Sequence, residues 1–208
     1  MYDFLNDLND FFCKNYANYN KLCVLKGYVM PVMQRSEVRE EGRTYAYTLP
    51  AETMSLANQQ NQDELLKDLK TRLVDMDFSF SFRPLSLFER IANLFSKYAI
   101  YKHLKATLKK YGISREEALD GLNIDKEIWT KICKGKFAPT KNLLYSLALT
   151  SQLAYEDTKF LMTICGFKLD FANVKDVVIS YLLSNKIYNR DMIDAALAEY
   201  KVANLFLK

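Results

Sequence analysis

The sequence has little of the residues on which most catalytic and metal sites depend. Histidine occurs once, as His103, and glycine occurs only six times in 208 residues. A single imidazole provides no histidine cluster for a metal, and any Ser-His-Asp or Cys-His arrangement would have to use His103. We interpret His103 as a surface helix residue, because its neighbours are lysines and no acidic or thiol partner has a suitable spacing. The glycines form no Gly-x-Gly-x-x-Gly or P-loop motif, so we expect no enzyme, no metal site and no cofactor.

Cysteine is also sparse, and long apolar runs are missing. The cysteines Cys13, Cys23, Cys133 and Cys165 form no Cys-x-x-Cys pair, which is typical of reduced thiols rather than of a disulfide framework. No segment approaches the roughly 18 consecutive apolar residues of a membrane helix. The N-terminus is acidic and amphipathic, unlike a secretion signal. We therefore expect a cytoplasmic protein with no membrane partner.

The positive charge of the chain is concentrated in one window. The net charge is +4, and residues 102–141 contain ten Lys or Arg against five Asp or Glu, whereas residues 142–208 contain seven of each. Such a local excess is the electrostatic footprint of a protein that binds phosphates. A solvated helical face would give the same pattern, so the charge alone leaves both interpretations open.

Residues 1–84 show a mixed pattern of helices and strands. Apolar spacing predicts helices over 3–20 and 51–75, and β-type sequence predicts strands over 22–33 and 44–49 with a charged loop over 35–43 between them. Phe78, Phe80 and Phe82 alternate with serine, which predicts a third short strand with its rings in the core. We interpret residues 1–84 as a small α+β unit of unknown role with a short antiparallel sheet.

After Pro84 the strand pattern ends, and helical periodicity continues through the rest of the chain. The apolar residues from Leu87 to Tyr98 lie on one face of a helix that continues or bends toward Tyr111. Gly112, Gly135 and Gly166 mark helix ends. The predicted fold class is therefore α+β but predominantly α, with an all-helical domain over residues 85–208.

Within this domain, residues 114–134 have the pattern of two short helices joined by a tight turn. Ser114 and Glu117 have the spacing of a capping box, and Asp125 can cap the second helix. Asn123, which tolerates a left-handed backbone, lies at the turn. Apolar residues of the two helices can face each other across this turn, namely Leu119, Leu122, Ile128, Trp129 and Ile132.

These residues resemble the lambda-repressor-like (XRE-type) helix-turn-helix family, over about residues 100–167. The features that carry the likeness are Gly112-Ile113-Ser114, Asn123, Asp125, Lys134-Gly135-Lys136, Pro139-Thr140 and a helix over 156–164. The resemblance implies a bacterial transcriptional regulator that binds duplex DNA and whose helix 125–134 enters the major groove. A looser similarity, over about residues 100–205, is to the helical module that follows some bacterial macro domains, and it implies no activity.

The resemblance also implies which residues contact DNA. Arg115 and Lys136 would hold phosphates. The exposed face of helix 125–134 would present Lys126, Thr130, Lys131 and Lys134 to the groove. Asp125 and Glu127 lie at the same end of that helix, and phosphate repels carboxylates. The alternative is therefore a non-catalytic adaptor, a repurposed helix-turn-helix fold that binds a protein partner.

Two further apolar helical faces follow, one from Val174 to Leu182 and one from Met192 to Tyr200. As additional helices of a regulator, they would supply the two-fold contact of a homodimer. They would equally well complete the core of the helical domain. The sequence leaves these two roles open.

Overall fold

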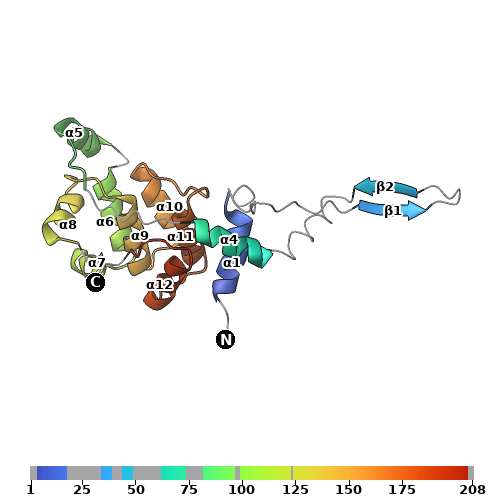
Figure 1. The fold of residues 1–208 in the computed structure, drawn as a ribbon. Helices are drawn as coiled ribbons and strands as arrows, with labels where there is room; N and C mark the ends of the chain where they lie inside the picture. The colour runs from blue at the N-terminus through green and yellow to red at the C-terminus, as the bar shows by residue number, and fades with distance from the viewer. Residues whose placement is uncertain are drawn as a thin grey trace. The chain divides into compact units, whose positions relative to one another are not determined.

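The computed structural model describes residues 4–17, 34–38, 44–48, 62–73, 82–96, 99–122 and 124–205. The chain divides into two compact units, which we call the helical unit (Met1–Tyr16 with Val74–Lys208) and the hairpin unit (Ala17–Leu73). The described part is predominantly helical, as predicted (Figure 1). The helical unit contains α1 (Phe4–Asn15), α5 (Leu87–Phe95), α6 (Ile100–Lys110), α7 (Arg115–Leu122), α8 (Lys126–Cys133), α9 (Lys141–Thr150), α10 (Tyr155–Ile164), α11 (Val174–Ser184) and α12 (Arg190–Glu199). None of the described helices combines the length and the apolar character needed to cross a bilayer.

The hairpin unit contains two strands and one helix. Strand β1 (Gln34–Val38) pairs antiparallel with β2 (Thr44–Thr48), and Ser36 lies opposite Ala46. The predicted charged loop over 35–43 is wrong for residues 35–38, which belong to β1. Backbone hydrogen bonds alone pair a two-stranded ribbon, so β1 forms without the apolar pattern on which the prediction relied. Helix α4 (Gln62–Arg72) lies within the predicted helix 51–75. The predicted strand 22–33 and residues 78–81 of the predicted third strand lie outside the described residues.

Helix α11 forms the centre of the helical unit. All of its residues from Val174 to Leu183 are buried, and it packs against α1, α9, α10 and α12. A helix buried on every side belongs to a core. Helix α12 likewise buries Ile193, Ala196 and Leu197. The two apolar faces therefore contribute to the core of the helical unit.

A buried carboxylate joins α9 to α11. Asp176 is 2% exposed and accepts hydrogen bonds from the Tyr145 hydroxyl (2.6 Å) and from the backbone N–H of Asp170 (2.7 Å). It also pairs with the ammonium group of Lys141. Tyr145 and Lys141 belong to α9, so one side chain of α11 holds that helix and the loop that precedes α11. The buried charge is tolerated because both carboxylate oxygens have partners.

Helix α1 belongs to the helical unit although it lies far from it in sequence. The Tyr181 hydroxyl of α11 lies 2.9 Å from the carboxylate of Asp7 and donates to it. Beyond the end of α12, the Tyr200 hydroxyl donates to Asn9 Oδ1 (2.9 Å), and the Tyr200 ring stacks on Phe12 with centroids 4.3 Å apart. The predicted boundary at residue 84 is therefore wrong for α1. An amphipathic pattern shows that a helix covers a core, but it does not show which core.

Candidate nucleic-acid interface

The predicted DNA-binding residues belong to a group of five consecutive helices, α6 to α10. Helix α7 packs on α9, and α6 packs on both α8 and α10 (Figure 1). The turn between α6 and α7 is closed at Gly112, which has a φ of +67°, a left-handed conformation that favours glycine. The next N–H, of Ile113, donates to the carbonyl oxygen of Leu108 (3.0 Å), as in a Schellman motif. This helix end is where the sequence predicts it.

The start of α7 is a capping box, which confirms the prediction from Ser114 and Glu117. The Glu117 N–H donates to Ser114 Oγ (3.1 Å), and the Ser114 N–H donates to Glu117 Oε2 (2.7 Å). The backbone N–H of Ser114 lowers the pKa of the Glu117 carboxyl group below its ordinary value. The first turn of α7 is thus fixed by local bonds.

Helix α8, the predicted recognition helix, is fixed at its start and in its middle. The Asp125 carboxylate accepts from the backbone N–H groups of Glu127 (2.7 Å) and Ile128 (3.2 Å), which confirms that Asp125 is the N-cap. Trp129 is 3% exposed, and its indole N–H donates to the Arg115 carbonyl oxygen (2.9 Å). This bond holds α8 beside the start of α7. Asn123, the predicted turn residue, lies outside the described residues.

Four of the six predicted DNA-binding residues are exposed cations. They are Arg115 at the start of α7, Lys126 at the start of α8, and Lys134 and Lys136 at and after its end. None of the four forms an ion pair with an acidic residue in the described ranges. In an ideal helix Lys126 and Lys134 lie about 12 Å apart along the axis and about 80° apart around it. Their side chains can therefore serve one extended anionic surface.

The other two predicted residues, Thr130 and Lys131, are half-buried and already have partners. The Thr130 hydroxyl donates to the Lys126 carbonyl oxygen (2.7 Å). The Lys131 ammonium group pairs with Glu127 (2.6 Å) and lies 5.4 Å from the centre of the Phe137 ring. Both side chains are therefore less exposed than their place on the outer face of the helix predicts. The spacing of Glu127 and Lys131, four residues apart on one helix, is the signal that could have shown the pairing.

The segment after α8 is held against the segment before α5. The Leu85 N–H donates to the Lys136 carbonyl oxygen (2.9 Å), and the Ala138 N–H donates to the Arg83 carbonyl oxygen (3.1 Å). Immediately before Lys136, Gly135 has a φ of +66°, and a Cβ there would approach the Tyr101 ring to 3.0 Å. The position therefore needs glycine for its conformation and for space. The loop that carries Lys134 and Lys136 is thus fixed by backbone bonds.

A tyrosine hydroxyl, missed from the sequence, takes the place of a cap at the start of α10. The N-cap, Ala154, has no side chain for this role. Its N–H donates to the Tyr111 hydroxyl (2.8 Å), which itself donates to Asp157 (2.5 Å). The Lys110 ammonium group also bonds Asp157, and it is the main cause that lowers the pKa of this carboxyl group. These hydrogen bonds hold the start of α10 to the end of α6.

His103, Cys133 and Cys165 have the side chains best suited to catalysis, and all three are partly or fully buried. His103 is half-buried, more than the surface position predicted, and its ring meets Phe160 edge-on with centroids 5.4 Å apart. Burial raises the pKa of the Cys133 thiol to about 11 and that of Cys165 to about 12, so both thiols are protonated at neutral pH. Across the described ranges, no three His, Cys, Asp or Glu residues are grouped to hold a metal ion.

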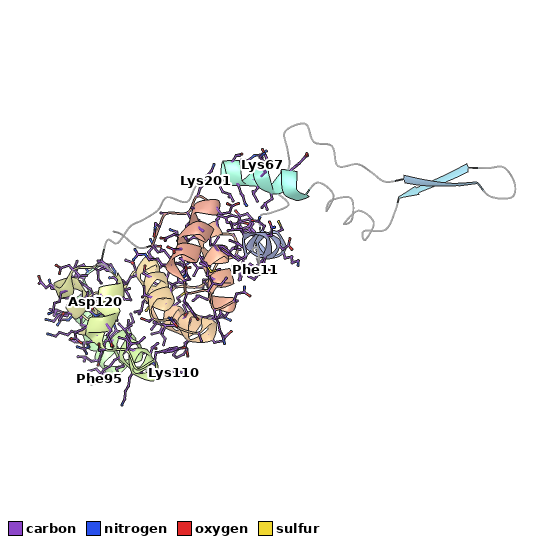
Figure 2. The ribbon with its side chains drawn as sticks, turned by 90° about the horizontal axis from the view of Figure 1, so that it is seen from below. Phe11, Lys67, Phe95, Lys110, Asp120 and Lys201 are labelled. Carbon is purple, nitrogen blue, oxygen red and sulfur yellow. The ribbon has the colours of Figure 1, made fainter. Side chains whose placement is uncertain are left out.

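Helix α5 presents an apolar face to solvent. Its exposed apolar side chains, between 53% and 86% accessible, are Leu87, Phe88, Ile91, Leu94 and Phe95. Phe95, at the end of the helix, is labelled in Figure 2. The helix starts with a capping box of Ser86 and Glu89 and has its C-cap at Ser96, so it ends before α6 rather than continuing into it. The predicted apolar face exists, but within the described residues it is largely uncovered.

No family model, curated protein or solved structure matches this chain.

Proposed function

We propose that this protein binds duplex DNA through α8 and the residues that flank it, as a non-catalytic, lambda-repressor-like regulator of bacterial transcription. The observation that carries the proposal is the set of exposed cations Arg115, Lys126, Lys134 and Lys136, which lack acidic partners in the described ranges. Phosphate contacts supply much of the affinity of a protein for DNA. Cations that are not neutralised within the protein are the groups that make such contacts.

The two carboxylates at the start of α8 repel DNA phosphates less than two free carboxylates would. Asp125 is occupied as the N-cap of α8, where it accepts two backbone hydrogen bonds. Glu127 is paired with Lys131, so this pair carries no net charge. At α8 and its flanks, the positive charge that no acidic residue neutralises is therefore supplied by the four exposed cations. This supports phosphate binding by the ends of α8, with a smaller contribution from Lys131.

The test is the salt dependence of binding to fragmented duplex DNA, measured by fluorescence anisotropy between about 50 and 200 mM salt. We expect a linear fall of the logarithm of affinity with the logarithm of salt concentration. Each lost phosphate contact reduces the slope by about 0.9, so the variant Lys126→Glu/Lys134→Glu should reduce it by about 1.8. Its affinity at the lowest salt should fall at least about tenfold.

A matched control removes the same charge elsewhere. Lys159 and Lys168 are exposed and lie outside α8 and its flanks, so Lys159→Glu/Lys168→Glu should leave the slope unchanged. Glu127→Gln should strengthen binding, because it releases Lys131 from its ion pair. An equal loss of affinity in the control and the α8 variant, or no DNA binding at the lowest salt, would contradict the proposal.

A second candidate function, binding of a protein partner, is favoured by the exposed apolar face of α5. Contiguous apolar surface of this kind marks interaction sites in soluble proteins. Under this alternative, a protein captured by the tagged chain remains bound after nuclease treatment. Its capture is lost in Phe88→Ser/Phe95→Ser and kept in Lys126→Glu/Lys134→Glu. A capture that nuclease abolishes would instead support binding through DNA.

A further inference from the structure

A cavity lies in the helical unit at the junction of three helices. Its volume is about 440 Å³, within the usual range for small-molecule sites. It is lined by one side of α6, by the turn that follows, by the start of α7 and by Cys133 at the end of α8. The apolar lining includes Leu104 and Leu108, each 3% exposed, together with Ile113 and the Tyr101 ring. The sequence analysis singled out none of these side chains for binding.

The charged side chains that line this cavity are all positive. Lys105, Lys109 and Arg115 line it, and no carboxylate does. These three residues are exposed and have no ion pair with a described acidic residue. Such side chains place their aliphatic stems along apolar surface and their charged ends in water. Three cationic side chains therefore line a largely apolar cavity.

Lys105 and Lys109 also repel each other when no ligand is bound. Lys105 and Lys109 are four residues apart on α6, a spacing at which like charges on a helix repel each other by a few tenths of a kcal/mol. Neither has a carboxylate to relieve this repulsion within the described ranges. An anion bound between them would supply the missing opposite charge.

We propose that this cavity binds a small amphiphilic carboxylate, a molecule with an apolar chain or ring that ends in a carboxylate group. The apolar body lies against Leu104, Leu108 and Ile113, and the carboxylate lies at Lys105, Lys109 and Arg115. A free phosphate group fits less well, since it would leave the apolar lining unfilled. A water molecule occupies about 30 Å³ of liquid, and a methylene group is similar in size, so a chain of about ten carbons fits the volume.

The proposal goes beyond DNA binding and does not depend on it. Arg115 belongs to both surfaces, so the two ligands would compete for one cation if both bind. A carboxylate in the cavity would then weaken DNA binding by direct competition for Arg115.

The experiment titrates decanoate into the 15N-labelled full chain and follows backbone amide resonances by NMR. Decanol, which has the same chain without the charge, is titrated in parallel. We expect shifts at Leu104, Leu108, Gly112 and Ile113, with decanoate binding about tenfold more tightly than decanol. We expect Lys105→Gln/Lys109→Gln to weaken decanoate binding about tenfold, because two charge interactions of partly exposed groups together give an effect of this size.

Two control variants locate the site. Lys159→Gln/Lys168→Gln removes the same charge outside the cavity, and Phe88→Ser/Phe95→Ser removes the apolar face of α5. Decanoate binding should be unchanged in both, and all variants should keep the spectrum of a folded chain. Shifts confined to α5, equal affinity for decanol, or an equal loss in the lysine control would each overturn the proposal.

An apolar chain that ends in a carboxylate occurs both in soluble molecules and in fatty acids released at a membrane. Phosphatidylcholine vesicles that contain oleic acid, with pure phosphatidylcholine vesicles as the neutral control, distinguish these sources. Cosedimentation with the oleic-acid vesicles that Lys105→Gln/Lys109→Gln abolishes would assign the site to a membrane-held fatty acid. Decanoate binding without cosedimentation would assign it to a soluble carboxylate.

Discussion

Replacement of Asp176 by alanine should lower the free energy of unfolding by about 3 kcal/mol. The carboxylate is 2% exposed and holds Tyr145, Lys141 and the Asp170 backbone together. Its removal leaves a buried tyrosine hydroxyl and a backbone N–H without their acceptor, and each unsatisfied group costs about 1 to 3 kcal/mol. The Lys141 side chain is 29% exposed, so its ammonium group can turn toward water. We therefore expect the lower end of the range known for broken buried ion pairs.

The measurement is urea unfolding at neutral pH, followed by circular dichroism and by the fluorescence of Trp129, the single tryptophan. Asp120→Ala is the control, because Asp120 is exposed on α7 (Figure 2) and should change stability by less than about 0.5 kcal/mol. Tyr145→Phe removes one bond to the carboxylate but keeps the ion pair, and it should cost about 1 kcal/mol. Equal effects of Asp176→Ala and Asp120→Ala would show that the buried network contributes nothing.

Local features of the fold could be predicted from the sequence because they depend on neighbouring residues. The capping box of Ser114 and Glu117, the cap at Asp125 and the helix end at Gly112 each involve residues within a few positions of one another. Backbone geometry fixes their spacing, so a pattern in the sequence is sufficient. In the same way, the spacing of apolar residues correctly predicts that one face of α5 is apolar.

Features that depend on distant residues could not be predicted. Asp176 finds Lys141 and Tyr145 across 35 and 31 positions, and Tyr111 reaches Ala154 across 43. No periodicity encodes such distances. For the same reason the cavity was missed, since it joins α6 and the start of α7 to Cys133. Lys131 is less exposed than its place on the outer face of α8 predicts, because it pairs with Glu127 four residues before it.

Replacement of Phe12 by alanine should lower the free energy of unfolding by about 3 to 5 kcal/mol. Phe12 is 0% exposed and stacks on Tyr200, beyond α12, and on Tyr16. Alanine would leave a cavity between α1 and the C-terminal end of the helical unit, and the lost aromatic contacts add to the lost apolar burial. Phe88→Ala is the matched control, because Phe88 is 86% exposed on α5 and should change stability by less than about 0.5 kcal/mol.

The same measurement tests which unit α1 belongs to. Trp129 lies on α8, in the helical unit and more than a hundred residues from Phe12, so its fluorescence reports the unfolding of that unit. If α1 completes the helical core, Phe12→Ala moves the Trp129 transition to lower urea concentration together with the loss of helical circular dichroism. If α1 instead folds with the residues that follow it, the Trp129 transition stays in place while part of the helical signal is lost earlier. That second outcome would restore the domain boundary near residue 84 expected from the sequence.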